Sequence, residues 1–422
     1  MRPVRGPALI LVSLLGAACA PPPGVLRVRQ TLRKGSVASA LEVYEKLRAR
    51  KRPEAGEALR EIAGATVVRA ALAPDRPTRD AAFSALGTLG EQAPPLYERI
   101  LRRGEAPARS RAAEGLLRSE DDSGVDVLRR ALRSPDGEIR AAGVSWLAVE
   151  GKWKRIRPFL LDLDSGVRAA AARSYASARL RAETVLALRE ALRLDPEPAV
   201  RAAAARALSR TPSAVDALVA ALGDRSLGVR AAALSALAAV RGPVALSRIE
   251  RIASGEATAE GTAAAAALAS MGEPRGVVYL RRSLRSSDAE LRRQAVAAGG
   301  HLPALRPDLA ALLSDPEAEV RLRAALALRR VRPHRRAARD VLAALLAAGS
   351  AQALPAAVAL AEAGDTRARA RLREALGSDR ASDRVLAVQA IGDRLGEGTS
   401  VRRSLLDPDA RVRVSAARAI LR

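Results

Sequence analysis

A segment of about 30 residues recurs along this 422-residue chain, and this repeat constrains the fold more than any other feature. The clearest copies are LDLDSGVRAAAARS at 161–174, LDPEPAVRAAAARAL at 194–208, GDRSLGVRAAALSAL at 223–237, SDPEAEVRLRAALAL at 314–328 and LDPDARVRVSAARAI at 406–420. When the shared arginine is the reference, successive copies lie 28 to 33 residues apart. Such a steady period indicates a repeat protein, in which each unit packs only on its neighbours.

Each repeat has the pattern of two helices. In the copy at 223–240, apolar residues recur at helical spacing between Val229 and Leu237, and residues 215–222 of the preceding unit do the same. Ala-rich segments follow an Asp or Ser and a proline, which predicts helix starts because the oxygen can cap a free N–H and proline has none to lose. The predicted starts are Ser134-Pro135, Asp195-Pro196, Asp315-Pro316 and Asp407-Pro408. Only 2% of residues are aromatic, so we expect a core of closely packed Ala, Leu and Val.

An acid or a hydroxyl stands six residues before the shared arginine in eight copies. These arginines are Arg140, Arg168, Arg201, Arg230, Arg292, Arg321, Arg384 and Arg413. The repeat length and this Asp-x5-Arg pattern resemble the HEAT-like repeats of the phycobilin-lyase type, over about residues 70 to 422. The resemblance implies an all-α, right-handed α-solenoid of about twelve helix-pair repeats, with a structural ladder of Arg and Asp between successive repeats. A row of ligand-binding arginines is the alternative, and the repeat itself says little about function.

The first twenty residues, MRPVRGPALILVSLLGAACA, have the layout of an export signal. Two arginines precede a short apolar run, and small residues precede Cys19. Cys19 is the only cysteine, so the monomer can form no internal disulfide. Its position resembles the lipobox of bacterial lipoproteins, in which the cysteine is lipidated and becomes the mature N-terminus, although Gly16 stands where a leucine is usual. Ordinary cleavage nearby is the alternative.

The sequence therefore divides into four parts. We expect a signal peptide at 1–18, a lipidated Cys19 with an extended tether at 19–35, an N-terminal capping helix pair at 36–72, and the solenoid at 73–422. Residues 406–422 are expected to cap the far end of the solenoid, because a terminal repeat has no neighbour to cover it. Ala20, rather than Asp, follows Cys19, and by resemblance to enteric sorting rules this places the exported protein on the periplasmic face of the outer membrane.

The net charge of +25 attracts polyanions in principle. However, acids and bases alternate along the chain, and only five of the 71 basic residues are lysine, which is typical of a GC-rich genome. Two local clusters rise above this background as candidate partner-binding residues. One is the acid-free run 321–339, with Arg329, Arg330, Arg335 and Arg336; the other is Trp153 with Lys152 and Lys154. Trp153 is expected in an exposed turn, and Trp146 in the core.

The sequence offers no catalytic or metal-binding constellation. The two histidines, His301 and His334, lie outside any metal-ligand spacing, and no Walker, GxGxxG or GxSxG motif occurs. We therefore expect neither an enzyme nor a cofactor. The expected function is a membrane-tethered scaffold of the bacterial cell envelope, whose concave face binds a protein partner. One alternative is a binder of anionic polymers or lipids, such as lipopolysaccharide; export and the scarcity of aromatic residues argue against nucleic acid as the polymer. The other alternative is a lyase of the phycobilin type.

Overall fold

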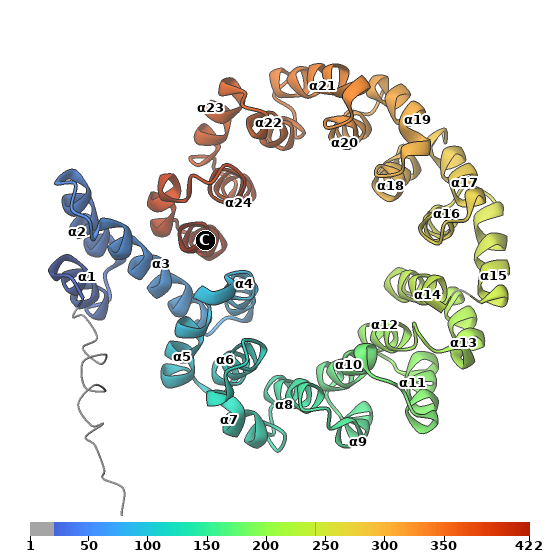
Figure 1. Ribbon diagram of the computed structural model, residues 1–422, viewed down its shortest axis with the longest axis horizontal. Helices are drawn as coiled ribbons and strands as arrows, with labels where there is room; N and C mark the ends of the chain where they lie inside the picture. The colour runs from blue at the N-terminus through green and yellow to red at the C-terminus, as the bar shows by residue number, and fades with distance from the viewer. Residues whose placement is uncertain (1–20, 241) are drawn as a thin grey trace, which may run out of the picture.

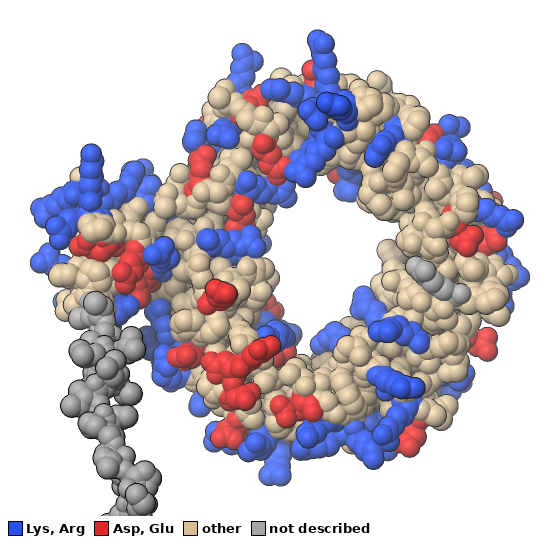
Figure 2. Space-filling model, viewed as in Figure 1, with Lys and Arg blue, Asp and Glu red and all other residues tan. Residues whose placement is uncertain are grey.

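A computed structural model of the chain describes residues 21–240 and 242–422, and within these ranges the chain is helical and has no β-strand. The prediction of an all-α solenoid of helix pairs is confirmed. Helices of an inner row alternate with helices of an outer row, and the two rows curve into a ring around a central opening (Figures 1 and 2). The signal peptide and Cys19 lie outside the described residues.

The inner row consists of the Ala-rich helices that follow the repeat signature. They are α4 (Arg76–Leu86), α6 (Ala106–Arg118), α8 (Gly137–Val149), α10 (Ser165–Ser174), α12 (Pro198–Ala207), α14 (Leu227–Val240), α16 (Ala259–Ser270), α18 (Ala289–Gly299), α20 (Ala318–Leu328), α22 (Ala353–Glu362), α24 (Ala381–Gln389) and α25 (Ala410–Leu421). Alanine is the side chain that lets helix axes approach closely, and most alanines of this row are buried. The sequence-predicted core of Ala, Leu and Val is the observed one.

The outer row completes each pair. Its helices are α5 (Pro94–Arg103), α7 (Val125–Ala131), α9 (Trp153–Ile156), α11 (Ala182–Leu194), α13 (Val215–Ala220), α15 (Pro243–Ser254), α17 (Pro274–Leu284), α19 (Arg306–Ala311), α21 (Arg335–Ala347) and α23 (Thr366–Ala375). The 3-10 segments η3 (Arg157–Leu161) and η11 (Gly398–Leu406) occupy outer positions after α9 and before α25. The two rows touch closely: a Cβ on Gly276 of α17 would lie 2.3 Å from the backbone N of Ala269 in α16.

Three helices precede the first inner helix. They are α1 (Pro23–Arg33), α2 (Val37–Ala49) and α3 (Ala55–Ala71). The extended tether expected at 19–35 is wrong for most of its length, because Val25 and Val28 of α1 are fully buried and α1 packs on α2 and α3. Helix α1 thus begins four positions after Cys19.

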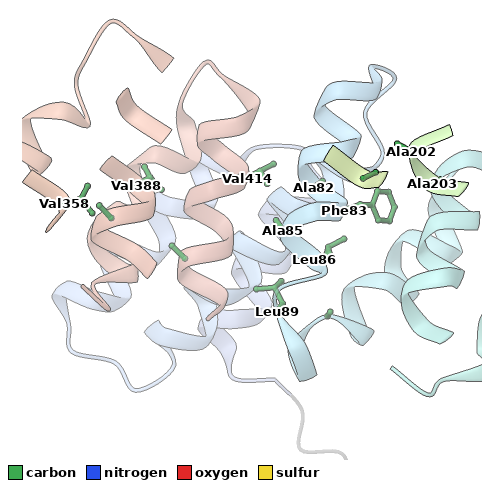
Figure 3. Close-up of a cluster of buried hydrophobic side chains, with 14 of the residues drawn as sticks. Ala82, Phe83, Ala85, Leu86, Leu89, Ala202, Ala203, Val358, Val388 and Val414 are labelled. Atoms are coloured by element: carbon green, nitrogen blue, oxygen red, sulfur yellow. The ribbon is translucent and has the colours of Figure 1, made fainter. Parts of the chain in front are cut away.

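The C-terminal helix closes the ring. Helix α25 packs on α3 and α4 as well as on α24, and Val414 of α25 lies beside Ala82 and Ala85 of α4 (Figure 3). The Nε atom of Arg402 donates a hydrogen bond of 2.6 Å to Glu45 of α2, which lies 357 residues away in the sequence. The expectation of end caps at 36–72 and 406–422 is therefore wrong, because each of these segments covers the apolar side of the other.

Candidate functional site

In most repeats the shared arginine forms a bridge to the next repeat. In the repeat of Arg201, the Nε and Nη2 atoms donate to the carboxylate of Asp224 at 2.7 and 2.9 Å. The Nη1 atom donates to the backbone carbonyls of Asp195 and Pro196 in its own loop, at 2.8 and 3.1 Å. The side chain of Arg201 is only 14% exposed, and that of Asp224 is 12% exposed. Each such arginine thus fixes its own loop and the following repeat at once.

Five of the eight arginines make this two-sided contact with an aspartate. The pairs are Arg140–Asp162, Arg168–Asp195, Arg201–Asp224, Arg292–Asp315 and Arg384–Asp407. Arg230 instead contacts Glu260, which precedes the degenerate copy at Gly261, at 2.6 Å. Arg321 and Arg413 make only the two carbonyl contacts, and neither has an ion pair within the described residues. All eight side chains therefore have a structural contact, and they lie on separate repeats rather than together in one ligand site.

The aspartates of the ladder do not start helices, which corrects the sequence prediction. Helix α12 begins at Pro198, two residues after the predicted start, with Glu197 as its N-cap. The same shift of two holds at Ser134-Pro135, Asp315-Pro316 and Asp407-Pro408, where the N-caps are Asp136, Glu317 and Asp409. The reason is that Oδ1 of Asp195 accepts the amide of Glu197 at 2.9 Å and forms a turn before the helix.

These contacts lower the pKa values of several aspartates of the ladder. The hydrogen bond from Arg140 lowers the pKa of Asp162, and the one from Arg201 lowers the pKa of Asp224. Burial alone would raise the pKa of Asp315, but hydrogen bonds from Arg292 and from the Glu317 amide hold it below its ordinary value. The ladder is therefore built for ionised carboxylates.

A groove on the outer side of the ring exposes four leucines. It lies between η3 and α11, has a volume of about 800 Å³, and is lined by Leu161, Leu163, Leu186 and Leu194. These side chains are 84%, 98%, 62% and 58% exposed, and they make up four of the ten exposed large apolar residues of the described chain. We call this surface the leucine groove. Sequence reasoning missed it, although two of its leucines flank the ladder residue Asp162 in the sequence Leu-Asp-Leu.

The leucine groove continues into a basic cavity near the start of α11. This cavity of about 570 Å³ shares Arg157 and Glu183 with the groove, and these two side chains form an ion pair. Its other basic residues, Lys152, Lys154, Arg155, Arg179 and Arg181, have no carboxylate partner in the part of the chain that the structure describes. The predicted residues Lys152, Lys154 and Trp153 are therefore brought together beside an apolar surface.

Trp153 itself is half-buried rather than fully exposed. Its ring lies 6.1 Å from that of Tyr175, and its backbone carbonyl accepts a hydrogen bond of 2.8 Å from the Tyr175 hydroxyl. It therefore forms one wall of the basic cavity, while Trp146 is buried in the core as expected.

The arginine-rich run 321–339 is only partly gathered into one surface. Arg329, Arg330, Arg335 and Arg339 line a cavity of about 420 Å³ between α20, α21 and α22, and Arg336 does not line it. Arg329 is paired with Glu362 at 2.7 Å, and Arg339 approaches Asp365 at 3.6 Å. Arg330 and Arg335 remain as the exposed cations of this cavity without an ion pair among the described residues.

The described residues contain no cluster of His, Cys, Asp or Glu that could hold a metal ion. Within residues 21–240 and 242–422, no helix has the length and apolar character needed to span a bilayer. His301 is exposed and His334 is half-buried, and they lie on separate repeats.

Comparison with known proteins supports the class of fold. Residues 185–260, which comprise the region from α11 to the start of α16, match the family model of HEAT repeats. Residues 185–260 therefore match HEAT repeats, and they form part of an α-solenoid of helix pairs that runs through the described chain. Comparison with curated protein sequences finds no match.

Several solved structures match the chain with low TM-scores. YibA of Escherichia coli is 16% identical, with 72% of this chain and 96% of that chain covered and a TM-score of 0.32. Kap121p bound to Nup53p is 12% identical, with 92% and 52% covered and a TM-score of 0.39. An engineered protein is 22% identical, with 89% and 97% covered and a TM-score of 0.28. This chain thus spans about half the length of Kap121p.

Proposed function

We propose that this protein is an interaction scaffold of the bacterial cell envelope, held at a membrane through a lipid on Cys19, and that it acts by binding a protein partner rather than by catalysis. The observation that carries the binding role is the leucine groove. Four leucines that are more than half exposed line one groove on the outer side of the ring, in a chain whose other large apolar side chains are mostly buried. Contiguous exposed apolar surface of this kind marks interaction sites in soluble proteins.

The chemistry of the groove defines the partner segment. Helix α11 spans 13 residues, or about 20 Å, and the groove follows it from Glu183 to Leu194. The apolar half suits leucine-like side chains, and the basic cavity at the other end suits carboxylates. A partner segment of about three helical turns, apolar along its length and acidic at one end, would complement both halves.

The position of α1 supports the tether. The first residue of α1, Pro23, lies four positions after Cys19, and an extended chain over four steps reaches about 14 Å. A lipid on Cys19 would therefore hold the ring close to the bilayer with α1 nearest to it. Helix α11, which borders the leucine groove, lies on a different side of the ring from α1 (Figure 1).

Site-specific crosslinking in the source cells tests the partner surface. A photo-crosslinking amino acid would replace Leu163 or Leu186 in the groove, and Leu227 as a control that is 59% exposed outside it. We expect one discrete protein adduct from both groove positions, which mass spectrometry maps to an apolar segment with acidic residues at one end. Equal adduct yields from Leu227, or adducts with lipid alone, would reject the groove as the binding surface.

A further inference from the structure

Another cavity, far from the leucine groove, carries an excess of arginine. It lies between α1, α3 and α5 and has a volume of about 660 Å³. Five arginines line it: Arg29, Arg33, Arg69, Arg99 and Arg103. Its apolar wall consists of Leu32, Ala65, Val68 and Leu72, and Glu61 is its single acidic residue. We call this site the arginine cavity.

One carboxylate cannot neutralise these five cations. Glu61 accepts a hydrogen bond of 2.9 Å from the Nε atom of Arg29 and lies 3.8 Å from Arg99. Arg33 and Arg103 are exposed and have no ion pair within the described residues, and Arg69 donates only to the backbone carbonyl of Gly35 at 3.1 Å. Burial lowers the pKa of Arg99, and the repulsion from Arg103 and Arg29 lowers this pKa further. The cavity therefore holds four more positive than negative charges.

A bound anion would relieve this imbalance, and arginine selects phosphate among anions. The guanidinium group donates two parallel hydrogen bonds to phosphate oxygens, so several arginines around one cavity form a strong phosphate site. The apolar wall at Leu32, Val68 and Leu72 gives the cavity a second character, which suits a ligand with a hydrocarbon part next to its phosphate.

The surroundings of the cavity point to a lipid surface as the source of that phosphate. Helices α1 and α2 project from the ring, and most of the closure is made by α25 on α3 and α4 (Figure 1). They present a dense patch of basic side chains (Figure 2). Its exposed residues without an ion pair in the described chain are Arg27, Arg33, Lys34, Lys46, Arg50 and Lys51, against the single free acid Glu42. Each cation near an anionic membrane surface adds about 1 kcal/mol to binding.

We propose that the arginine cavity binds the phosphate of an anionic lipid headgroup and that the basic face of α1 and α2 lies against the membrane surface around it. The ring then stands on the bilayer in one orientation. A lipid on Cys19 would hold the chain at the membrane, and the cavity would fix the orientation of the ring there. The cavity is independent of both the lipidation of Cys19 and the leucine groove, so a failure of the proposed scaffold function would leave this inference intact.

Vesicle binding by the chain from residue 21 tests the inference without the lipid anchor. This chain retains every contact described above. The probe is a vesicle of equal parts phosphatidylcholine and phosphatidylglycerol, compared with pure phosphatidylcholine, and bound protein is measured by flotation. We expect binding to the anionic vesicles only. The double variant Arg33→Gln/Arg103→Gln, whose residues lie on separate helices, should bind at least about tenfold more weakly because two surface cations are lost.

The control is the charge-matched variant Arg210→Gln/Arg251→Gln, in which both arginines are exposed, lack an ion pair and lie on distant repeats. Its binding should equal that of the unaltered chain. Two outcomes would overturn the inference. One is an equal loss of binding in both variants, which would indicate diffuse attraction to the whole charged surface. The other is calorimetric binding of inorganic phosphate or glycerol phosphate without vesicle binding, which would assign the cavity to a soluble ligand.

Discussion

Replacing Arg201 by Ala should test the arginine ladder most sharply. The change removes two hydrogen bonds to Asp224, at 2.7 and 2.9 Å, and two to the carbonyls of residues 195 and 196. It also leaves the 12% exposed carboxylate of Asp224 without its counter-ion. Breaking one partner of a buried ion pair costs about 3–5 kcal/mol, and the partial exposure of this pair places the expected loss near the lower bound, at about 3 kcal/mol.

Arg321 provides the matched control. Its Nη1 atom makes the same two carbonyl contacts, at 2.6 and 2.9 Å, but it has no carboxylate partner within the described residues. Arg321→Ala should therefore lower the free energy of unfolding only by the contribution of these two hydrogen bonds, about 1.5 kcal/mol. The difference between the two variants in free energy of unfolding gives the contribution of the ion pair between repeats, without that of the carbonyl contacts in the loop.

Urea unfolding followed by circular dichroism measures the total loss, and hydrogen exchange locates it. Because each repeat contacts mainly its neighbours, lost protection in Arg201→Ala should concentrate in α12, α13 and α14. The reasoning fails if Arg201→Ala and Arg321→Ala are equally destabilised, or if Arg201→Ala loses a bound ligand while its stability is unchanged. The second result would favour ligand-binding arginines over a structural ladder.

Four further outcomes follow from the structure and the sequence. The fold lowers the pKa values of Asp162 and Asp224, so the stability that the ladder adds is present above their unfolded pKa of about 3.9 and is lost as the pH falls below it. In urea titrations, the difference in free energy of unfolding between the unaltered chain and Arg201→Ala should therefore shrink below about pH 4. Cys19→Ser should move the protein from the detergent phase to the aqueous phase or leave it unprocessed, and unchanged partitioning and mass would reject the lipid anchor. Substituting Arg329, Arg330, Arg335 and Arg336 by Ser should reduce salt-sensitive retention on heparin if the cavity at α21 binds polyanions, whereas unaltered retention would reject a discrete site there. Val414→Asp places a charge in the closure contact of α25, and it should increase the radius measured by X-ray scattering because the ring opens, whereas Leu406→Asp, at a 49% exposed position just before α25, should not.

The helix pairs and the core could be predicted because they depend on local pattern. Val229, Ala233 and Leu237 recur at helical spacing, and all three are buried. The helix starts were displaced by two residues because the carboxylate of Asp195 binds both Arg168 of the preceding repeat and the amide of Glu197. A single sequence shows an Asp-Pro pair but not the distant arginine that competes for the aspartate.

The leucine groove, the arginine cavity and the ring closure could not be predicted for a different physical reason. The contact between Arg402 and Glu45 depends on the rotation between successive repeats, which accumulates over the whole chain, and small changes at each repeat would separate the ends. Similarly, Leu160 is buried and Leu161 is 84% exposed, although both belong to the same apolar run. Only the packing of η3 against α11 decides which of the two faces the solvent.

Closure of the ring also determines which surfaces are suited to bind a partner. An open solenoid can wrap its concave face around a partner, but here α25 joins α3 and α4, so the inner row surrounds a closed opening. On α14 of that row, Leu227 is exposed at the N-terminal end, but the other exposed residues, Gly228, Ala231, Ser235 and Ala239, are small. Small side chains supply few of the large anchors that dominate binding energy. The large apolar anchors, Leu163 and Leu186, lie on the outer side instead. Partner binding in the leucine groove therefore leaves the closure contacts of α25 intact, and the ring can remain a rigid support while its outer surface carries the specificity.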